Sequence, residues 1–162
     1  MTIAEITKKM VDFSEGNRWE ICHYLKVYAY AKTIGELEGL DEETQFILET
    51  AAITHDIACP LCEKKYGGAD GKLQEIEGEP LVREFLSDTG LTQAQIDRVA
   101  YLVAHHHTLE NIQGMDYQIL IEADYLVNAD ESSYSPENIA NMKKTVFRTK
   151  SGIELLESLY QV

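Results

Sequence analysis

The sequence predicts an all-α protein, and three observations lead to this prediction. Apolar residues recur every three or four positions along most of the 162-residue chain, the spacing that places them on one face of a helix. Capping residues and glycines separate these segments. Runs of β-branched residues with alternating polarity, which indicate strands, are missing throughout. Because no repeat or flexible linker divides the chain, we expect residues 1–162 to form a single-domain helical bundle.

Three helices are expected in the first third of the chain. Residues 2–13 are predicted to form a short helix and residues 18–38 a longer one, whose apolar positions step by three and four. Asp41, with Thr44 three residues later, is expected to cap a third helix. This helix should end near Pro60, because a proline ring disfavours helical geometry in the residue before it.

A loop and two further helices are expected in the middle of the chain. The glycines within residues 63–71 predict a loop, and residues 73–88 are predicted to form a helix that Pro80 kinks or splits. Thr92 is expected to cap the next helix, which ends in the histidine run at 105–107.

The last third of the chain predicts three more helices. Asp116 is expected to begin the first of them. Ser135 and Pro136 form a strong helix start, with an N-cap serine and a proline at the first helical position. Ser151 is expected to cap a short last helix, so the C-terminal helices should span about 135–160.

Charge and composition narrow the classes of partner. The formal net charge is -14 and no basic stripe interrupts it, so a nucleic-acid backbone would be repelled over most of the surface. No stretch approaches the roughly 20 apolar residues of a membrane span, and no basic segment followed by an apolar run begins the chain. The three cysteines form no disulfide framework. We therefore expect a cytoplasmic protein with neither a nucleic-acid nor a membrane partner.

Four polar residues stand out as candidates for metal binding. His23 lies within a helix that has an apolar face, and the pair His55 and Asp56 follows a run of small and apolar residues. Asp124 lies among apolar residues, where a carboxylate is costly to bury unless it is paired or binds a metal. Brought together by antiparallel helices, two imidazoles and two carboxylates would suit Mn, Fe, Co, Ni or Mg.

In these residues the sequence resembles the HD-domain metal-dependent phosphohydrolase superfamily, over residues 18 to 130 approximately. The family pattern is a histidine, then a His-Asp pair some tens of residues later, then a distant aspartate. The segments that carry the resemblance are His23–Val27, Ala51–Ile57 and Ile121–Leu126. The resemblance implies that His23, His55, Asp56 and Asp124 ligate one divalent metal ion in the core of a helical bundle.

Some members of this superfamily bind a second metal, through a further histidine after the His-Asp pair and a His-His pair before the last aspartate. His105 and His106 stand in the second of these places, but no histidine occurs between Asp56 and His105. Glu75 and Glu79 lie in roughly the region of the missing histidine, and a carboxylate could take its place. The sequence therefore leaves open whether the protein binds a second metal ion.

Helical spacing predicts how the histidine run is oriented. With Val99 and Val103 facing the core, His106 should turn inward most directly and His105 should lie to one side. We expect His105 and His106 to bind either a second metal or a substrate phosphate, and His107 to lie outside the first ligand shell.

A metal site of this kind would hydrolyse a phosphate ester. A divalent ion lowers the pKa of its bound water and polarises a phosphoryl oxygen. The expected substrate is therefore a small phosphorylated metabolite, with a nucleotide as the leading candidate. The resemblance suggests that Asp56 is both a ligand and the group that orients or deprotonates that water. Lys26, three residues after His23, lies on nearly the same helical face and is expected to bind the substrate phosphate and assist catalysis.

The cysteines offer a competing site. His55, Cys59 and Cys62 have the spacing of a zinc site, and Cys22 is the available fourth ligand. A closed zinc site normally has a second close pair of ligands, which the sequence lacks. A redox Cys-x-x-Cys is a further alternative, although the strand that precedes such motifs is not expected here.

Two other functions stay open at the level of sequence. One is a non-catalytic, metal- or nucleotide-binding regulatory HD domain; the other is a di-iron oxygenase, since a few relatives by fold activate oxygen with two irons. The oligomeric state also stays open, a homodimer included, because Trp19, Tyr28 and Tyr30 near one helix suit an interface as well as a core.

Overall fold

Helix α3 (Glu42–Thr54) is the central helix of the structure, a computed structural model that describes residues 1–162. Every residue from Ile47 to Thr54 is buried, because α3 packs against α1, α2, α6 and α7. Nine helices and no strand make up the chain, which confirms the all-α prediction. The other helices are α1 (Ile3–Phe13), α2 (Arg18–Leu37), α4 (Cys59–Tyr66), α5 (Gly71–Leu86), α6 (Gln93–Val103), α7 (Met115–Glu131), α8 (Pro136–Thr145) and α9 (Lys150–Tyr160).

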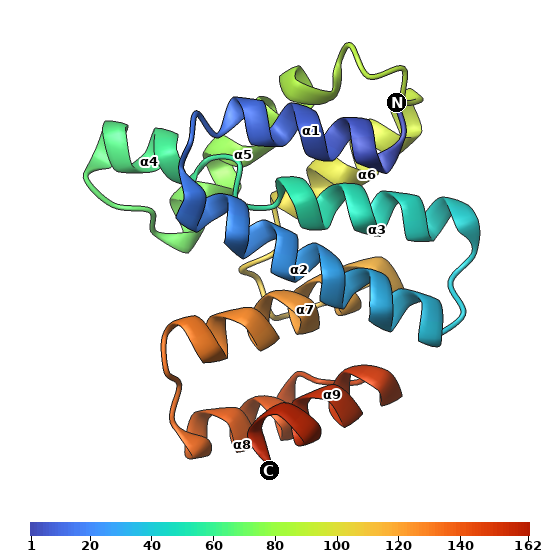
Figure 1. The fold of residues 1–162 in the computed structure, drawn as a ribbon, viewed down its shortest axis with the longest axis vertical. Helices are drawn as coiled ribbons and strands as arrows, with labels where there is room; N and C mark the ends of the chain where they lie inside the picture. The colour runs from blue at the N-terminus through green and yellow to red at the C-terminus, as the bar shows by residue number, and fades with distance from the viewer.

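The helices form a bundle in which a central group of three is flanked by the remaining helices. Figure 1 shows α2, α3 and α7 crossing its middle, with α1 over one side and α8 and α9 below α7 at the C-terminal end. Helix α2 contacts both α3 and α7, so these three helices meet in one core. No helix in the structure has the length and apolar character that crossing a bilayer would require.

Local capping explains where several helices begin. The Asp41 side chain accepts the backbone N–H of Thr44 at 2.9 Å, as expected for the cap of α3. Thr92 and Gln95 form a reciprocal capping box at the start of α6. Ser135 caps α8, and Pro136 occupies its first turn. These helix starts confirm the predictions made from the sequence.

The region around Pro60 differs from the prediction. Helix α3 ends at Thr54, and Pro60 lies in the first turn of a separate helix, α4, instead of ending the one before it. A first-turn proline costs nothing, since its missing N–H would have had no partner there. Helix α4 ends at Tyr66, followed by Gly67 as its C-cap with a left-handed φ of 75°. The expected loop at 63–71 is therefore confined to residues 67–70, between α4 and α5.

Pro80 does not split α5, contrary to one reading of the sequence. The helix is continuous from Gly71 to Leu86. Pro80 removes the N–H that would bond the carbonyl of Ile76. Both residues are exposed, so water can satisfy that carbonyl and the helix continues.

The last helix is capped by Thr149 instead of the expected Ser151. The Thr149 hydroxyl accepts the N–H of Gly152 at 2.9 Å. The carboxylate of Glu122, fully buried on α7, accepts the backbone N–H groups of Arg148 at 2.6 Å and Thr149 at 3.0 Å. Glu122 therefore ties the start of α9 to α7 from a distant part of the sequence, which local spacing does not reveal.

Candidate metal centre and active site

Four side chains from three segments of the chain meet in the core. His23 comes from α2, His55 and Asp56 from the turn that follows α3, and Asp124 from α7. The Nε2 atoms of His23 and His55 are 3.3 Å apart. Oδ2 of Asp56 lies 3.2 Å from His23 Nε2 and 3.3 Å from His55 Nε2. Oδ1 of Asp124 lies 3.3 Å from both ring nitrogens. We call these four residues the HD cluster.

These separations fit one metal ion surrounded by the four atoms. Ligand atoms about 2.1 Å from a common ion are separated by roughly 3.0 to 3.4 Å in octahedral or tetrahedral geometry. Asp124 Oδ1 is also buried and has no hydrogen-bond partner in the protein. A buried, unpaired carboxylate oxygen is costly, and a cation at the centre of the cluster would satisfy it.

Each ring of the cluster is held so that Nε2 faces the centre. Nδ1 of His55 is 2.8 Å from the carbonyl oxygen of Ala52, within the same turn. Nδ1 of His23 is 2.8 Å from a carboxylate oxygen of Glu131, near the end of α7. Both acceptors require a proton on Nδ1. Each ring in its neutral form therefore has its lone pair on Nε2, toward the cluster, as a metal ligand must.

The two carboxylates of the HD cluster stay ionised. Burial would raise the pKa of Asp124, but the imidazoles of His23 and His55, each 3.3 Å from its Oδ1, hold it well below its usual range. The pKa of Asp56 is likewise lowered, because the nearby imidazoles outweigh the effect of burial. Burial would lower the pKa of His23, whereas the adjacent carboxylates of Asp124 and Asp56 raise it to about 10. The protein thus supplies two anionic oxygens at one point, and a divalent cation would compete there with protons.

The histidine run after α6 brings a third imidazole beside Asp56. His106 is buried, its Nδ1 is 2.8 Å from the carbonyl oxygen of Val103, and its Nε2 lies 3.3 Å from Oδ1 of Asp56. Nε2 of His106 has no hydrogen-bond partner. Ligand atoms of His107 also lie close to those of Asp56 and His106, although Nε2 of His107 is 2.9 Å from Oε1 of Gln74. Asp56 therefore faces the HD cluster with one oxygen and His106 with the other.

Three residues expected at the site lie elsewhere. His105 turns away, with Nδ1 at 2.7 Å from the carbonyl oxygen of Tyr101 and its ring stacked on that tyrosine. Glu79 pairs with Arg83 at the protein surface, 3.1 Å away. Lys26 pairs with Glu131 at 2.7 Å and lines a separate cavity.

Glu75, also expected near the site, supports the histidine turn. It is buried on α5, and its Oε1 accepts the backbone N–H of His107 at 3.1 Å and the hydroxyl of Thr108 at 2.8 Å. These bonds fix the turn that carries His106. Glu75 thus positions the turn, and its oxygens are not among the closely placed ligand atoms of Asp56, His106 and His107.

The cysteines do not gather into a metal site. No cysteine sulfur lies among the ligand atoms of His23, His55 and Asp56, or among those of Asp56, His106 and His107. Cys22 is exposed and Cys62 is buried, while Cys59 lines the cavity beside Asp56. Burial, and then the charge of Asp56, raise the pKa of the Cys59 thiol, which disfavours the thiolate that zinc binding or redox chemistry needs. The geometry therefore favours the HD cluster over the alternative zinc site.

Two cavities meet at the HD cluster. The larger, which we call the Trp19 cavity, has a volume of about 400 Å³ and is lined by Trp19, His23, Asp56 and Asp124 among others. The second, the Tyr134 cavity, has a volume of about 240 Å³ and contains Tyr134. His107, Asp124 and Asn128 line both cavities. The Trp19 cavity thus reaches His23, Asp56 and Asp124 of the cluster, whereas the Tyr134 cavity reaches the cluster through Asp124.

Several residues of the site were missed by sequence reasoning, although helical spacing could have indicated them. Asn128 and Glu131 follow Asp124 by four and seven residues, and Trp19 precedes His23 by four. Each therefore lies on the same helix face as a cluster residue. Gln74 gave no such signal, because it comes from α5 and reaches the site only through the tertiary fold.

Trp19 offers a direct optical report on the HD cluster. It is the sole tryptophan, it is 65% exposed, and its ring stacks on His23 with centroids 5.6 Å apart and an interplanar angle of 9°. We expect Co²⁺ or Ni²⁺ to quench Trp19 fluorescence saturably, because a paramagnetic ion on His23 lies next to the indole, and His23→Ala to abolish the effect. Unchanged emission during a cobalt titration that calorimetry shows to be saturating would contradict this placement.

The fold and the site define a class of helical proteins with a buried cluster of two histidines and two aspartates that could hold a divalent metal ion. The chain belongs to the HD domain family, whose sequence model matches residues 21–140. HD domains bind divalent metal ions, and the cluster supplies a suitable set of ligands. The solved structure of a predicted HD superfamily hydrolase from an uncultured Thermotogales bacterium is similar over 98% of this chain and 84% of that one, with a TM-score of 0.69 and 21% sequence identity. A search of curated proteins finds no match.

Proposed function

We propose that this protein is a metal-dependent phosphohydrolase that releases phosphate from a small phosphorylated metabolite, and that this metabolite is a nucleotide. Family membership supports a metal-dependent hydrolase in general. The observation that carries the proposal is the HD cluster, four ligand atoms 3.2 to 3.3 Å apart along five of their six separations, at the junction of two cavities. A substrate in either cavity would place its phosphate against these residues.

The proposed reaction uses His23, His55, Asp56 and Asp124 as ligands and Asp56 also as a proton acceptor. The bound ion would supply Lewis acidity and a water molecule of lowered pKa. Asp56 has a second carboxylate oxygen, on the side of His106, that can orient this water and accept its proton. The water oxygen would bond to phosphorus as the ester P–O bond breaks, and the proton taken up by Asp56 would pass to the leaving oxygen, which departs as the alcohol.

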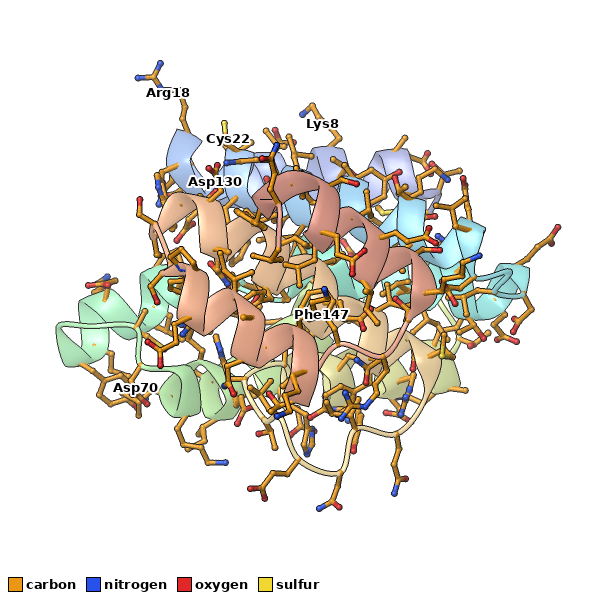
Figure 2. The ribbon with its side chains drawn as sticks, turned by 90° about the horizontal axis from the view of Figure 1, so that it is seen from below. Lys8, Arg18, Cys22, Asp70, Asp130 and Phe147 are labelled. Carbon is orange, nitrogen blue, oxygen red and sulfur yellow. The ribbon has the colours of Figure 1, made fainter.

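The charge of the cavities supports a substrate whose phosphate binds mainly through the metal. No lysine or arginine lines the Trp19 or the Tyr134 cavity, and Glu20 and Glu63 line the former. Arg18, although adjacent to Trp19 in sequence, extends away from the protein into solvent (Figure 2). His106, buried beside Asp56, is the best-placed further phosphate donor or second-metal ligand. Metal content per chain, measured with and without His106→Ala, distinguishes these two roles.

The Tyr134 cavity supports a nucleoside as the group that carries the phosphate. Tyr125 and Tyr134 lie with ring centroids 5.6 Å apart, and Asn128 and Asn138 add amide groups. Aromatic rings stack on bases, and amides form hydrogen bonds with their edges. Apart from Asp124 and its histidines, this cavity is uncharged, which suits a neutral planar group.

Tyr134→Ala tests the nucleotide part of the proposal. We expect the KM for a nucleoside monophosphate to rise about 3- to 10-fold with little change in kcat, because an aromatic contact contributes roughly 0.5–1.5 kcal/mol. The KM for a sugar phosphate, which has no base, serves as the internal control and should not change. An equal rise for both substrates would remove the support for base recognition.

The wider proposal is tested by a phosphatase screen of the protein reconstituted with Mn, Co, Ni or Mg. We expect metal-dependent release of inorganic phosphate from at least one small phosphate ester. Metal binding without phosphate release from any substrate would favour a regulatory domain. Two irons per chain with a charge-transfer band would favour an oxygenase.

A further inference from the structure

Glu131 connects His23 to a lysine outside both substrate cavities. Its Oε2 accepts the Nδ1–H of His23 at 2.8 Å, and its Oε1 accepts a proton of Lys26 Nζ at 2.7 Å. The side chains of His23 and Glu131 are 3% and 10% exposed, so their interaction is shielded from water, whereas Lys26, 48% exposed, reaches Glu131 from the surface. His23, Glu131 and Lys26 therefore form a chain of charge-assisted hydrogen bonds that leads away from the HD cluster.

This arrangement differs from the support of the other two inward-facing histidines. His55 and His106 each direct Nδ1 to the carbonyl oxygen three residues earlier, within the turn that carries them. His23 lies within α2, where the nearby carbonyls accept the helical backbone N–H groups. An acceptor for its Nδ1–H must come from another element, and Glu131 of α7 supplies it.

The spacing on α7 makes one helix face serve both sides of His23. Asp124 and Glu131 are seven residues apart, two helical turns, so their side chains project in nearly the same direction. Asp124 lies 3.3 Å from Nε2 of His23, while Glu131 holds Nδ1. One ring is thereby fixed at both nitrogens by one helix.

We infer that Glu131 is a positioning residue of the metal centre and that Lys26 acts through Glu131 instead of binding the substrate phosphate. The inference rests on the proposed metal centre. A carboxylate on the outer nitrogen of a ligating histidine fixes its tautomer and makes it a better ligand. Lys26 lines a cavity with Tyr30, Tyr160 and Asp130, and it does not line the Trp19 or Tyr134 cavity.

Cobalt affinity, measured by calorimetry and by the visible spectrum of bound Co²⁺, tests the role of Glu131. We expect Glu131→Ala to weaken binding about 10- to 100-fold, the usual effect of losing such a partner. Glu131→Gln keeps an acceptor oxygen for Nδ1–H and should lose less affinity. Asp130→Asn, which removes a negative charge from the adjacent residue (labelled in Figure 2), should bind cobalt like the wild type.

The outcomes separate positioning from general electrostatics. Wild-type affinity and spectrum in Glu131→Ala would overturn the inference. Equal losses of cobalt affinity in Glu131→Ala and Glu131→Gln would mean that only the negative charge of Glu131 matters. That result would overturn the positioning role. Equal losses of cobalt affinity in Asp130→Asn and Glu131→Ala would also overturn the positioning role. If Glu131→Ala does not fold, as thermal unfolding in chelator would show, the Gln variant and its cobalt spectrum still decide the question.

Lys26→Met tests the second half of the inference. We expect this substitution to change the cobalt Kd when Glu131 is present, and to cause no further change in Kd when it is combined with Glu131→Ala. It should leave the KM of a phosphate substrate unchanged. A raised KM with a wild-type Kd would assign Lys26 to the substrate, and a wild-type Kd with a wild-type KM would give it no role; either result overturns the assignment.

The proposed function can fail separately from this inference. A wild-type protein that binds cobalt but releases no phosphate would contradict the hydrolase, while the cobalt measurements on Glu131 would still apply. A wild-type protein that binds no cobalt would overturn both.

Discussion

Asp56→Asn is expected to lower kcat/KM for phosphate release about 1,000-fold or more, because it removes an anionic metal ligand and a proton acceptor together. Oδ2 of Asp56 lies within 3.3 Å of the Nε2 atoms of His23 and His55, and Oδ1 lies 3.3 Å from Nε2 of His106. An amide at this position presents one neutral oxygen and no basic site. Measuring phosphate release by the Asp56→Asn protein at saturating metal separates the two effects. A rate that stays low under these conditions reports the loss of the proton acceptor, because weaker metal binding has been compensated.

Asp70→Asn is the matched control for this substitution. Asp70 caps α5 at the surface, and asparagine is an equally good N-cap, so stability and activity should both stay near wild type. An Asp56→Asn protein that retains wild-type activity on the best substrate would rule out the proposed role of Asp56.

Glu122→Leu is expected to lower the free energy of unfolding by about 3–5 kcal/mol, and Tm by roughly 10 °C for a chain of this size. The substitution leaves the N–H groups of Arg148 and Thr149 without their acceptor at the buried start of α9. It also leaves the side-chain amide of Gln118 without the carboxylate that it contacts at 3.0 Å. Denaturant unfolding in excess chelator measures the effect apart from metal binding.

Glu154→Leu is the control for Glu122→Leu, because Glu154 is exposed on α9 and pairs only loosely with Lys150 at 3.8 Å. Its stability should lie within about 0.5 kcal/mol of wild type. Similar losses of stability in the two variants would mean that any glutamate-to-leucine change in α7 or α9 is destabilising, and that Glu122 is no special anchor.

Helices with a long apolar face could be predicted from the sequence, whereas short or tertiary features could not. The 18–38 periodicity and the caps at Asp41, Thr92 and Ser135 correspond to observed helices. Helix α4 has only eight residues and a weak apolar face, and Pro60 reads equally as an end or a beginning. The Thr149 cap depends on Glu122, 27 positions away, which no local window contains.

For the candidate site, spacing indicated which residues could meet but not what else would hold them. His23, His55, Asp56 and Asp124 do lie together, and His106 turns inward as helical spacing predicted. Lys26 lies on the predicted face of α2, yet its partner there is Glu131 of α7. The sequence contains both residues, but only the packing of α2 on α7 shows that the lysine is already paired.

Metal content of the purified protein, measured by elemental mass spectrometry after dialysis against Co²⁺, tests the HD cluster most directly. We predict at least one tightly bound divalent ion per wild-type chain and its loss in His55→Ala, a variant that removes a buried ring nitrogen from the centre of the cluster. A wild-type chain without bound metal, or an unchanged metal content in a folded His55→Ala protein, would contradict the account.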